Sequence, residues 1–252
     1  MKTIVIASSK GGSTKTTTSS TLARILSKMD FKTLLIDADL QCNSSDLYRA
    51  ETNGATTLFD VILDDNPVDI NEAIQHTDNG DIIAGDPLLR KADIILAGDP
   101  DGAHRLQDAL KKLKGYDYVI IDTAPAINIM LHNALVAADD VIIPITADRF
   151  AIQGISELST TIHAIKNRQN TKLNLAGILL CKYHDKQSLD KSILEGLEQI
   201  SEQIGTKVFE TKIRECAKVR QSQTVRKQLI DYAPACTTAR DYWKFTEELI
   251  NG

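Results

Sequence analysis

Five short and almost entirely apolar runs divide the chain, and stretches with helical periodicity lie between them. The runs are residues 3–7, residues 33–36 before Asp37, residues 118–121 before Asp122, residues 141–143 before Pro144, and residues 175–180. A strand that is apolar on both faces needs helices packed on both sides. The pattern therefore predicts a doubly wound α/β fold, with a mostly parallel sheet and helices on both of its faces.

Two further regions complete this outline. Between residues 51 and 115 the periodicity is weaker and turn-forming residues interrupt it, so we expect an insertion that flanks the sheet. Residues 238–250 place Tyr242 and Phe245 at helical spacing, which predicts a helix docked on the body. No linker or internal repeat divides the chain, so we expect residues 1–252 to form a single domain.

The composition is typical of a folded cytoplasmic protein. The chain is 42% hydrophobic and 25% charged, with 13 glycines and 6 prolines. Its 4 cysteines are widely spaced and form no C-x-x-C pair, which indicates neither a zinc site nor a disulfide framework. No apolar stretch approaches the ~18 residues needed to cross a bilayer, so we expect no membrane partner. The net charge of -5 still leaves room for one local basic patch.

A glycine-rich loop lies between the first predicted strand and the first predicted helix. Glycines let a backbone approach phosphate groups, and the N–H groups at a helix N-terminus supply partial positive charge. In this setting Lys15 is placed to reach the β- and γ-phosphates and Thr16 to ligate Mg²⁺. The loop departs from G-x-x-x-x-G-K-[ST], because Ser9 and Thr14 occupy its glycine positions. The candidate ATP-binding residues are Lys10, Gly11, Gly12, Ser13, Thr14, Lys15, Thr16 and Thr17.

Three aspartates follow buried strands at the edge of the sheet where ligands of doubly wound folds bind. Asp122 ends one strand, and Asp37 and Asp39 end another. Mg²⁺ is held by oxygen ligands, and an attacking water needs an acceptor to orient it, so carboxylates here suit a Mg²⁺·ATP site. We expect only one of Asp37 and Asp39 to point at the phosphates unless the loop bends. Capping of a helix is the alternative role for each aspartate.

Four ordered motifs resemble the ParA/MinD ATPases, a branch of the P-loop NTPases with a deviant Walker A loop. They are K-G-G-x-x-K-T at residues 10–16, D-A-D-L-Q at residues 37–41, the Walker B strand with the following loop at residues 116–125, and N-A-L-V-A-A-D at residues 133–139. The resemblance runs nearly end to end and is strongest to ParA. It implies an ATPase that uses ATP and Mg²⁺ and forms an ATP-dependent homodimer with the nucleotides sandwiched between subunits.

The resemblance also assigns roles to single residues. It implies that Lys10 reaches the phosphates of the partner subunit, while Lys15 acts in its own subunit. By the same resemblance Asp39 positions the lytic water, which makes Lys10, Lys15 and Asp39 the expected catalytic residues. Thr16, Asp37 and Asp122 are then the expected Mg²⁺ site. A second cation at the γ-phosphate acts as an arginine finger does, by stabilising charge on the transferring phosphoryl group.

Three positions depart from the family pattern. Thr14 replaces the usual glycine before Lys15, Leu40 replaces a proline, and Ala124 replaces the first proline of D-x-P-P. A β-branched residue resists positive φ, so if relatives use a left-handed glycine there, Thr14 must hold the loop differently. We expect nucleotide binding to survive, because Lys15 and Thr16 are intact.

A basic stretch stands out on this acidic chain. Residues 212–227 hold six cations against the single acid Glu215. Few aromatic residues accompany them, so the stretch suits contact with a nucleic-acid backbone better than base stacking or base readout. The resemblance to ParA favours nonspecific DNA binding, for which the expected residues are Arg214, Lys218 and Arg220. The alternative is a solvated basic face.

These features together predict a partition ATPase for a plasmid or a chromosome. The resemblance implies a ParB-type centromere-binding partner that stimulates hydrolysis, and a cytoplasmic, nucleoid-associated location. The first strand begins at Thr3, so we expect the short form without an N-terminal helix-turn-helix domain. A ParA/MinD-like ATPase that positions another cargo, or acts at a membrane, is the alternative. Adenine contacts are expected near residues 181–182 and 213–214.

Overall fold

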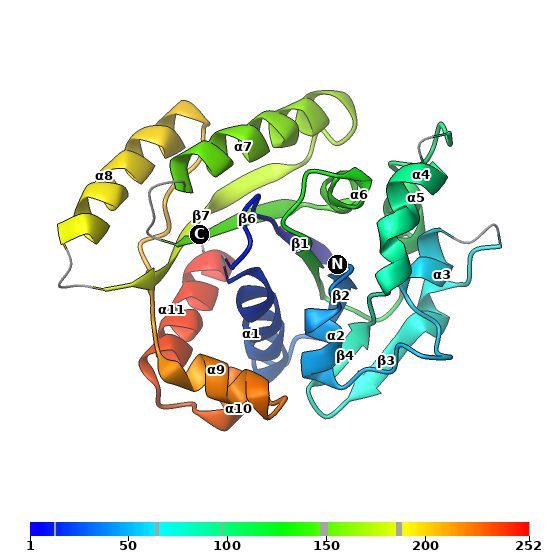
Figure 1. Ribbon diagram of the computed structural model, residues 1–252, viewed down its shortest axis with the longest axis horizontal. Helices are drawn as coiled ribbons and strands as arrows, with labels where there is room; N and C mark the ends of the chain where they lie inside the picture. The colour runs from blue at the N-terminus through cyan, green and yellow to red at the C-terminus, as the bar shows by residue number, and fades with distance from the viewer. Residues whose placement is uncertain (13, 64–65, 97, 147–150, 185–187, 252) are drawn as a thin grey trace.

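A twisted sheet forms the centre of the molecule in the computed structural model, which describes residues 1–12, 14–63, 66–96, 98–146, 151–184 and 188–251. Within these residues the sheet has eight strands in the order β3-β4-β2-β5-β1-β6-β7-β8 (Figure 1). All neighbours pair in parallel except β3 and β4, which are antiparallel. The strands are β1 (Lys2–Ile6), β2 (Thr33–Ala38), β3 (Ile74–Thr77), β4 (Gly80–Ile83), β5 (Tyr118–Thr123), β6 (Asp140–Thr146), β7 (Asn174–Tyr183) and β8 (Ile213–Arg214). The predicted fold class is confirmed.

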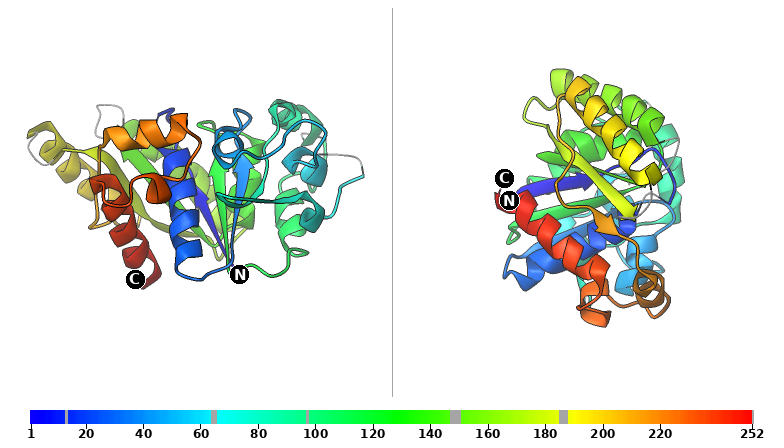
Figure 2. Two further views of the ribbon diagram at one scale, coloured as in Figure 1. Left: turned by 90° about the horizontal axis from the view of Figure 1, so that it is seen from below. Right: turned by 90° about the vertical axis from the view of Figure 1, so that its left-hand side faces the viewer.

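Helices cover both faces of the sheet (Figures 1 and 2). One face packs against α3 (Leu58–Ile62), α4 (Ala92–Leu96), α5 (Arg105–Leu110), α6 (Ile129–Ala137), α7 (Ala151–Arg168) and α8 (Ser188–Gln203). The other packs against α1 (Lys15–Lys28), α2 (Asn43–Tyr48), α10 (Leu229–Tyr232) and α11 (Thr237–Asn251). Short 3₁₀ helices run over Ile70–Ala73 and Pro87–Lys91, and α9 (Ala217–Thr224) lies beside α10.

Alternate strand residues enter opposite cores, which explains why the strands are apolar throughout. In β2, Leu34 and Ile36 belong to one apolar cluster and Leu35 to the other. In β1, Val5 and Ile4 divide in the same way. Each strand is therefore buried from both sides, as the near-continuous apolar runs predicted.

Four of the five predicted strands continue beyond their predicted ends, and β6 shows why. Pro144 was expected to end its strand, yet it lies inside β6, in register with Leu179 of β7. The pairing of β1 with β6 ends at Ile142, and Ala7 N–H donates to the Ile142 carbonyl at 3.1 Å. Beyond that point β6 has one neighbour, so the missing N–H of Pro144 costs no ladder hydrogen bond.

Residues 51–115 are more than a flanking insertion. They supply β3 and β4, and β4 pairs in parallel with β2 through Leu35 and Ile82. Gly80 opens β4 at φ +124, a backbone conformation that favours glycine. The turn signal at this glycine was read correctly, but the short strands beside it were missed, because four residues carry too little periodicity.

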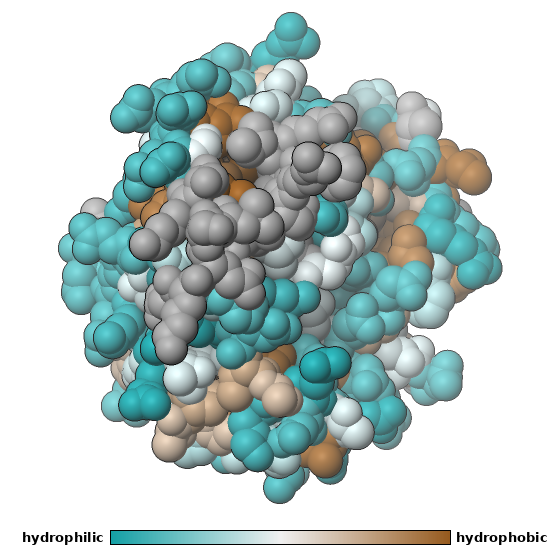
Figure 3. Space-filling view, turned by 60° about the vertical axis from the view of Figure 1, so that its left-hand side comes forward, coloured by the Kyte–Doolittle hydropathy of each residue, from teal (hydrophilic) through white to brown (hydrophobic). Residues whose placement is uncertain are grey.

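The chain after β8 closes over the body. Helix α11 confirms the predicted C-terminal helix, and its Tyr242 and Phe245 are both 0% exposed. On the face shown in Figure 3, hydrophilic side chains cover most of the described surface and apolar ones form small separate areas. No helix among the described residues has the length and apolar character that crossing a membrane requires.

The strand register brings the predicted site together. Asp122 in β5 is the register partner of both Asp37 in β2 and Ile6 in β1. The glycine-rich loop follows β1 directly and leads into α1. The loop and the aspartates thus meet at the carboxyl edge of the sheet, where we expected them.

Thr14 does not hold the loop differently; it adopts the left-handed conformation itself. Its φ is 69° and its ψ is 17°, immediately before α1. A β-branched residue resists this conformation, so Thr14 adopts it against its local preference. The side chain contributes in compensation, because it lies close to the buried hydroxyl of Tyr242 in α11 and opposes the rise in the pKa of that group. Tertiary contact thus offsets local strain.

We predict that the free energy of unfolding of Thr14→Gly exceeds that of Thr14→Ala by about 1 kcal/mol. Both variants lose the hydroxyl, so the pair isolates the cost of a β-carbon at positive φ. This order is the reverse of that inside a helix, where alanine is favoured. Thermal unfolding without nucleotide measures the difference, which corresponds to about 2–4 °C for a chain of this size. Equal stability of the two variants would show that position 14 carries no such strain.

Candidate nucleotide site

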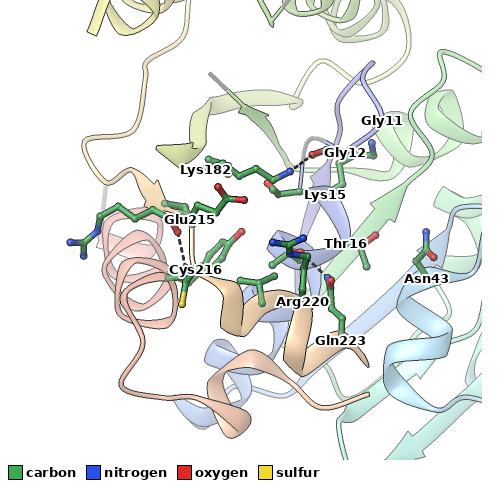
Figure 4. A pocket seen from close by; sticks show the side chains of 18 of the residues that line it. Gly11, Gly12, Lys15, Thr16, Asn43, Lys182, Glu215, Cys216, Arg220 and Gln223 are labelled. Atoms are coloured by element: carbon green, nitrogen blue, oxygen red, sulfur yellow. Dashed lines mark hydrogen bonds between the residues drawn. The ribbon is translucent and has the colours of Figure 1, made fainter. Parts of the chain in front are cut away.

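A cavity of about 810 Å³ opens at the carboxyl edge of the sheet. The glycine-rich loop forms one wall, and α9 forms the opposite wall. In Figure 4, Lys15 and Thr16 lie on one side of this space and Arg220 and Gln223 on the other. The lining includes Gly11, Gly12, Thr14, Lys15, Thr16, Thr17, Asp39, Lys182 and Arg214. Ser13, an expected ATP-binding residue, lies outside the described residues.

Lys15 is almost fully enclosed, with 7% of its surface exposed. Its Nζ donates to the Lys10 carbonyl at 3.2 Å, which curls the loop around the ammonium group. Burial lowers the pKa of Lys15, and the nearby carboxylates of Asp122 and Asp39 oppose that shift. Lys10 itself is exposed. The two lysines therefore differ in exposure. The enclosed Lys15 suits a cation that acts within its own subunit, and the exposed Lys10 suits one that acts on another molecule.

Asp122 is fully buried and held by hydroxyl groups. Its Oδ2 accepts from Thr16 Oγ1 at 2.8 Å and from Ser44 Oγ at 2.7 Å. Its Oδ1 accepts from Ser19 Oγ at 3.0 Å. Burial raises the pKa of Asp122, although these hydrogen bonds and Lys15 favour the carboxylate. Its described partners are hydroxyls on α1 and α2, which is not the pattern of a helix cap.

Asp37 lies beside Asp122 and is equally buried. Its Oδ2 accepts from the backbone N–H of Ser45 at 2.8 Å and from Ser45 Oγ at 2.7 Å. Burial, followed by the charge of Asp122, raises the pKa of Asp37 to about 7. Asp37 also serves the capping role that we gave as an alternative, since Ser45 lies in the first turn of α2.

The paired carboxylates suit a divalent cation. Two adjacent buried carboxylates cannot both ionise without a compensating charge, and Mg²⁺ prefers oxygen ligands. Among the described residues, no three acidic, histidine or cysteine side chains gather as a metal cage. A cation here would take the Thr16 hydroxyl, phosphate oxygens and water alongside the aspartates, as Mg²⁺ commonly does.

Asp39 faces the cavity, whereas Asp37 does not. It lines the cavity, and its Oδ1 accepts from Gln41 N–H at 2.9 Å. Asp37 is instead covered by α2 through Ser45. Only one of the two aspartates thus faces the ligand space, as their spacing led us to expect, and it is Asp39, as the resemblance implied.

Four functional residues were not predicted from the sequence. Ser19, Ser44 and Ser45 orient the aspartates, and Gly85 leaves room for them. A Cβ at Gly85 would lie 2.9 Å from the Asp37 carbonyl oxygen and 3.1 Å from that of Asp39. The serine pair that begins three residues after the end of the D-A-D-L-Q motif was the available signal. Its meaning required knowing that α2 folds back over β2 and β5.

The far end of the cavity meets β7 and β8. Cys181, Lys182, Ile213 and Arg214 all line it, where we expected adenine contacts. Lys182 Nζ donates to the Gly12 carbonyl at 3.3 Å, so it closes the cavity against the loop (Figure 4). The adenine assignment itself stays a prediction.

The three expected DNA-binding residues do not form one group. Arg214 lies in β8, and its Nε and Nη2 donate to Asp241 at 2.9 and 2.6 Å. Asp241 is 5% exposed, so this arginine has a structural partner. Lys218 and Arg220 are both exposed on α9. They are two residues apart and therefore point in different directions, with Arg220 at the cavity.

We predict that Asp37→Asn stabilises the nucleotide-free protein at about pH 8 by about 2 kcal/mol. A raised pKa means that the carboxyl group favours the folded state below its unfolded value of 3.8 and loses that contribution as pH rises through about 7. Asparagine can still accept from Ser45 without carrying charge. Urea unfolding in chelator at about pH 5 and about pH 8 tests the difference. Equal destabilisation at both pH values would contradict the raised pKa.

Known proteins resemble this chain over its whole length. A family model described as an AAA domain matches residues 1–175. The chromosome partitioning protein ParA of Caulobacter vibrioides (strain NA1000 / CB15N) is 32% identical over 256 residues, which cover 100% of this chain and 94% of that protein.

Solved structures agree with the sequence matches. Apo McdA from Cyanothece superposes with a TM-score of 0.88 at 26% identity, covering 99% of both chains. A putative plasmid partition protein from Borrelia burgdorferi B31, bound to AMPPNP, gives a TM-score of 0.78 at 26% identity, covering 99% of this chain and 97% of that one. The loop, the aspartates and these similarities lead to one conclusion. The chain belongs to the ParA family of P-loop ATPases.

Proposed function

We propose that this chain is a DNA-partition ATPase that serves plasmid or chromosome segregation. One observation carries the proposal: a single cavity is lined by the phosphate loop, by Asp39 and by the basic helix α9. The nucleotide would thus bind at the phosphate loop, and nucleic acid would bind at α9 on the other side of the cavity. The ParA of C. vibrioides is named as a chromosome partitioning protein, and the similar B. burgdorferi protein as a plasmid partition protein.

ATP with Mg²⁺ is the proposed ligand. The buried loop lysine Lys15 would bind the phosphates, and Thr16, Asp37 and Asp122 would hold the cation. Bound Mg²⁺ supplies charge that offsets the phosphate oxygens. Asp39 would accept a hydrogen bond from the attacking water, because its carboxylate lines the cavity. The structure of the B. burgdorferi protein with AMPPNP supports an adenine nucleotide here.

Lys10 is proposed to act on a second subunit. Its side chain is exposed at the mouth of the loop, whereas Lys15 is enclosed. An ATP-dependent homodimer would bring Lys10 to the partner's phosphates, where a second cation stabilises the charge of the transferring group. Dimerisation would then be required for efficient hydrolysis.

The proposed DNA surface centres on α9 and the loop after it. Lys218, Arg220 and Lys227 are exposed there, and exposed glutamine and threonine side chains are interspersed. Such a surface suits phosphate contacts without sequence readout. Arg214 remains a proposed contact, but its pairing with buried Asp241 makes its removal costly for the fold. A ParB-type partner would stimulate hydrolysis, and the protein would be cytoplasmic and nucleoid-associated.

Other roles within the family remain as alternatives. A ParA/MinD-like protein can position a different cargo, and the similarity to McdA leaves that open. Action at a membrane would need an available apolar helix face. The apolar side chains Tyr242 and Phe245 of α11 are instead packed in the core.

We predict that Lys15→Ala abolishes ATP binding, because it removes the enclosed phosphate ligand. Lys10→Ala and Asp39→Ala are expected to keep binding but to slow hydrolysis about 100-fold or more under partner-stimulated conditions. Calorimetry measures binding, phosphate release measures turnover, and sedimentation measures the dimer. Retained ATP binding in Lys15→Ala would exclude the loop as the phosphate site.

DNA binding provides the test of the partition role. We predict ATP-dependent, salt-sensitive binding to a random-sequence duplex, weakened in Lys218→Ala/Arg220→Ala with a salt slope smaller by about 2. The matched control is Arg168→Ala/Lys172→Ala, which removes the same charge from exposed positions at and after the end of α7. A dimer that forms on ATP and binds no DNA would refute nucleoid transport. Equal loss in both double variants would place the DNA surface elsewhere.

A further inference from the structure

Helix α2 contacts the buried aspartates on one side. Ser44 Oγ donates to Asp122 and Ser45 Oγ to Asp37, each at 2.7 Å. Ser44 and Thr16 donate to the same oxygen of Asp122. Any ligand that engages the Thr16 hydroxyl and this oxygen therefore competes with Ser44. The position of α2 depends on what occupies the carboxylate site.

The other end of α2 contacts the basic stretch. Asp46 Oδ1 forms an ion pair with Arg226 Nη2 at 2.6 Å, and Arg49 Nη2 donates to the Val225 carbonyl at 3.2 Å. Asn79 Nδ2 donates to the Leu47 carbonyl at 2.8 Å and to the Arg226 carbonyl at 3.3 Å. Three separate contacts thus join α2 to the residues that follow α9.

The backbone is strained at both ends of this contact. Arg49, which follows α2, has φ 57°, and Arg226, which follows α9, has φ 51°. Non-glycine residues at positive φ persist where surrounding contacts hold them, and they cluster at switch regions. Each residue also ends its own helix, where Arg49 N–H donates to the Asp46 carbonyl at 3.1 Å and Arg226 N–H to the Gln223 carbonyl at 2.9 Å. The contact therefore joins two helix ends that both finish in a left-handed residue.

We propose that α2 is a lever between the carboxylate site and the basic stretch, with Asp46 and Arg226 as positioning residues. The lever rests on the proposed function, in which Mg²⁺·ATP binds at one end and DNA at the other. A DNA phosphate competes with Asp46 for Arg226, and ligand at Asp122 competes with Ser44. Each binding event loosens α2 at one end and so lowers the free-energy cost of displacing it at the other end. DNA binding and ligand binding therefore favour each other, and the coupling is reciprocal.

The size of the coupling between the two ends of α2 follows from the solvent exposure of the Asp46–Arg226 ion pair. The side chains of Arg226 and Asp46 are 54% and 59% exposed, so their ion pair is screened by solvent. Exposed pairs of this kind correspond to about a 2- to 5-fold change in an equilibrium constant. The lever is thus a modulator of affinity rather than a strict gate.

Hydrogen exchange without DNA tests the lever directly. Binding of Mg²⁺·AMPPNP is expected to speed exchange of the amides in residues 217–228 by about 2- to 5-fold in the wild type. Asp46→Asn and Arg226→Gln should remove that response, and the swapped pair Asp46→Arg/Arg226→Asp should restore it. The control is Asp108→Asn, which breaks an equally exposed pair with Lys111 at 2.7 Å and should leave the response unchanged.

A second arm separates failure of the lever from failure of the proposed function. DNA should tighten Mg²⁺·AMPPNP binding by about 2- to 5-fold in the wild type and leave it unchanged in Asp46→Asn. A response that persists in both single variants, or is absent in a wild type that binds the nucleotide, overturns the lever. An exchange response without any DNA binding keeps the link through α2 and refutes the DNA partner. Failure to bind Mg²⁺·AMPPNP refutes the nucleotide proposal and the lever with it.

Discussion

Two carboxylates buried side by side at the carboxyl edge of the sheet are the constraint around which the rest of this structure is arranged. Asp37 and Asp122 are register partners on adjacent parallel strands, so neither can move away from the other without breaking the ladder. Burial, followed by the charge of Asp122, raises the pKa of Asp37 to about 7, and burial raises the pKa of Asp122, so the pair favours a proton near neutral pH. The cost of burying the charged carboxylate of Asp122 is reduced, but not removed, by the hydroxyls of Ser44, Thr16 and Ser19 and by the nearby Lys15. A site built in this way favours a divalent cation that arrives with phosphate.

The same constraint explains the shape of the surrounding chain. Helix α2 must fold back over the strand ends to bring its serines to the aspartates, and Gly85 must lack a side chain for that packing to close. Once α2 is there, its far end lies against the loop after α9. The basic helix thereby becomes a wall of the cavity, which links the chemistry of phosphate binding to the surface proposed for DNA.

The sequence predicted the frame of the molecule better than its details. Five apolar runs identified five strands, because burial on both faces leaves a strong signal, and the aspartates after two of these runs identified the edge where the ligand site lies. The strands β3 and β4 were missed since four residues have little periodicity. The position of Ser44 and Ser45 after the D-A-D-L-Q motif did not reveal their role, because that role depends on contacts between segments far apart in the chain. Arg214 looked like part of a basic patch, and only the fold reveals its partner, Asp241. Thr14 was misjudged for the same reason, since contact with Tyr242 holds a conformation that local preference disfavours.

The most direct test of this account is a calorimetric titration of Mg²⁺·AMPPNP at about pH 6 in two buffers with different ionisation enthalpies. The account predicts that binding releases a proton from the Asp37–Asp122 pair, so the observed heat depends on the buffer. Asp37→Asn, which lacks that proton, should show a smaller dependence. Binding whose buffer dependence is identical in the wild type and in Asp37→Asn would contradict the claim that the buried pair is where the cation acts.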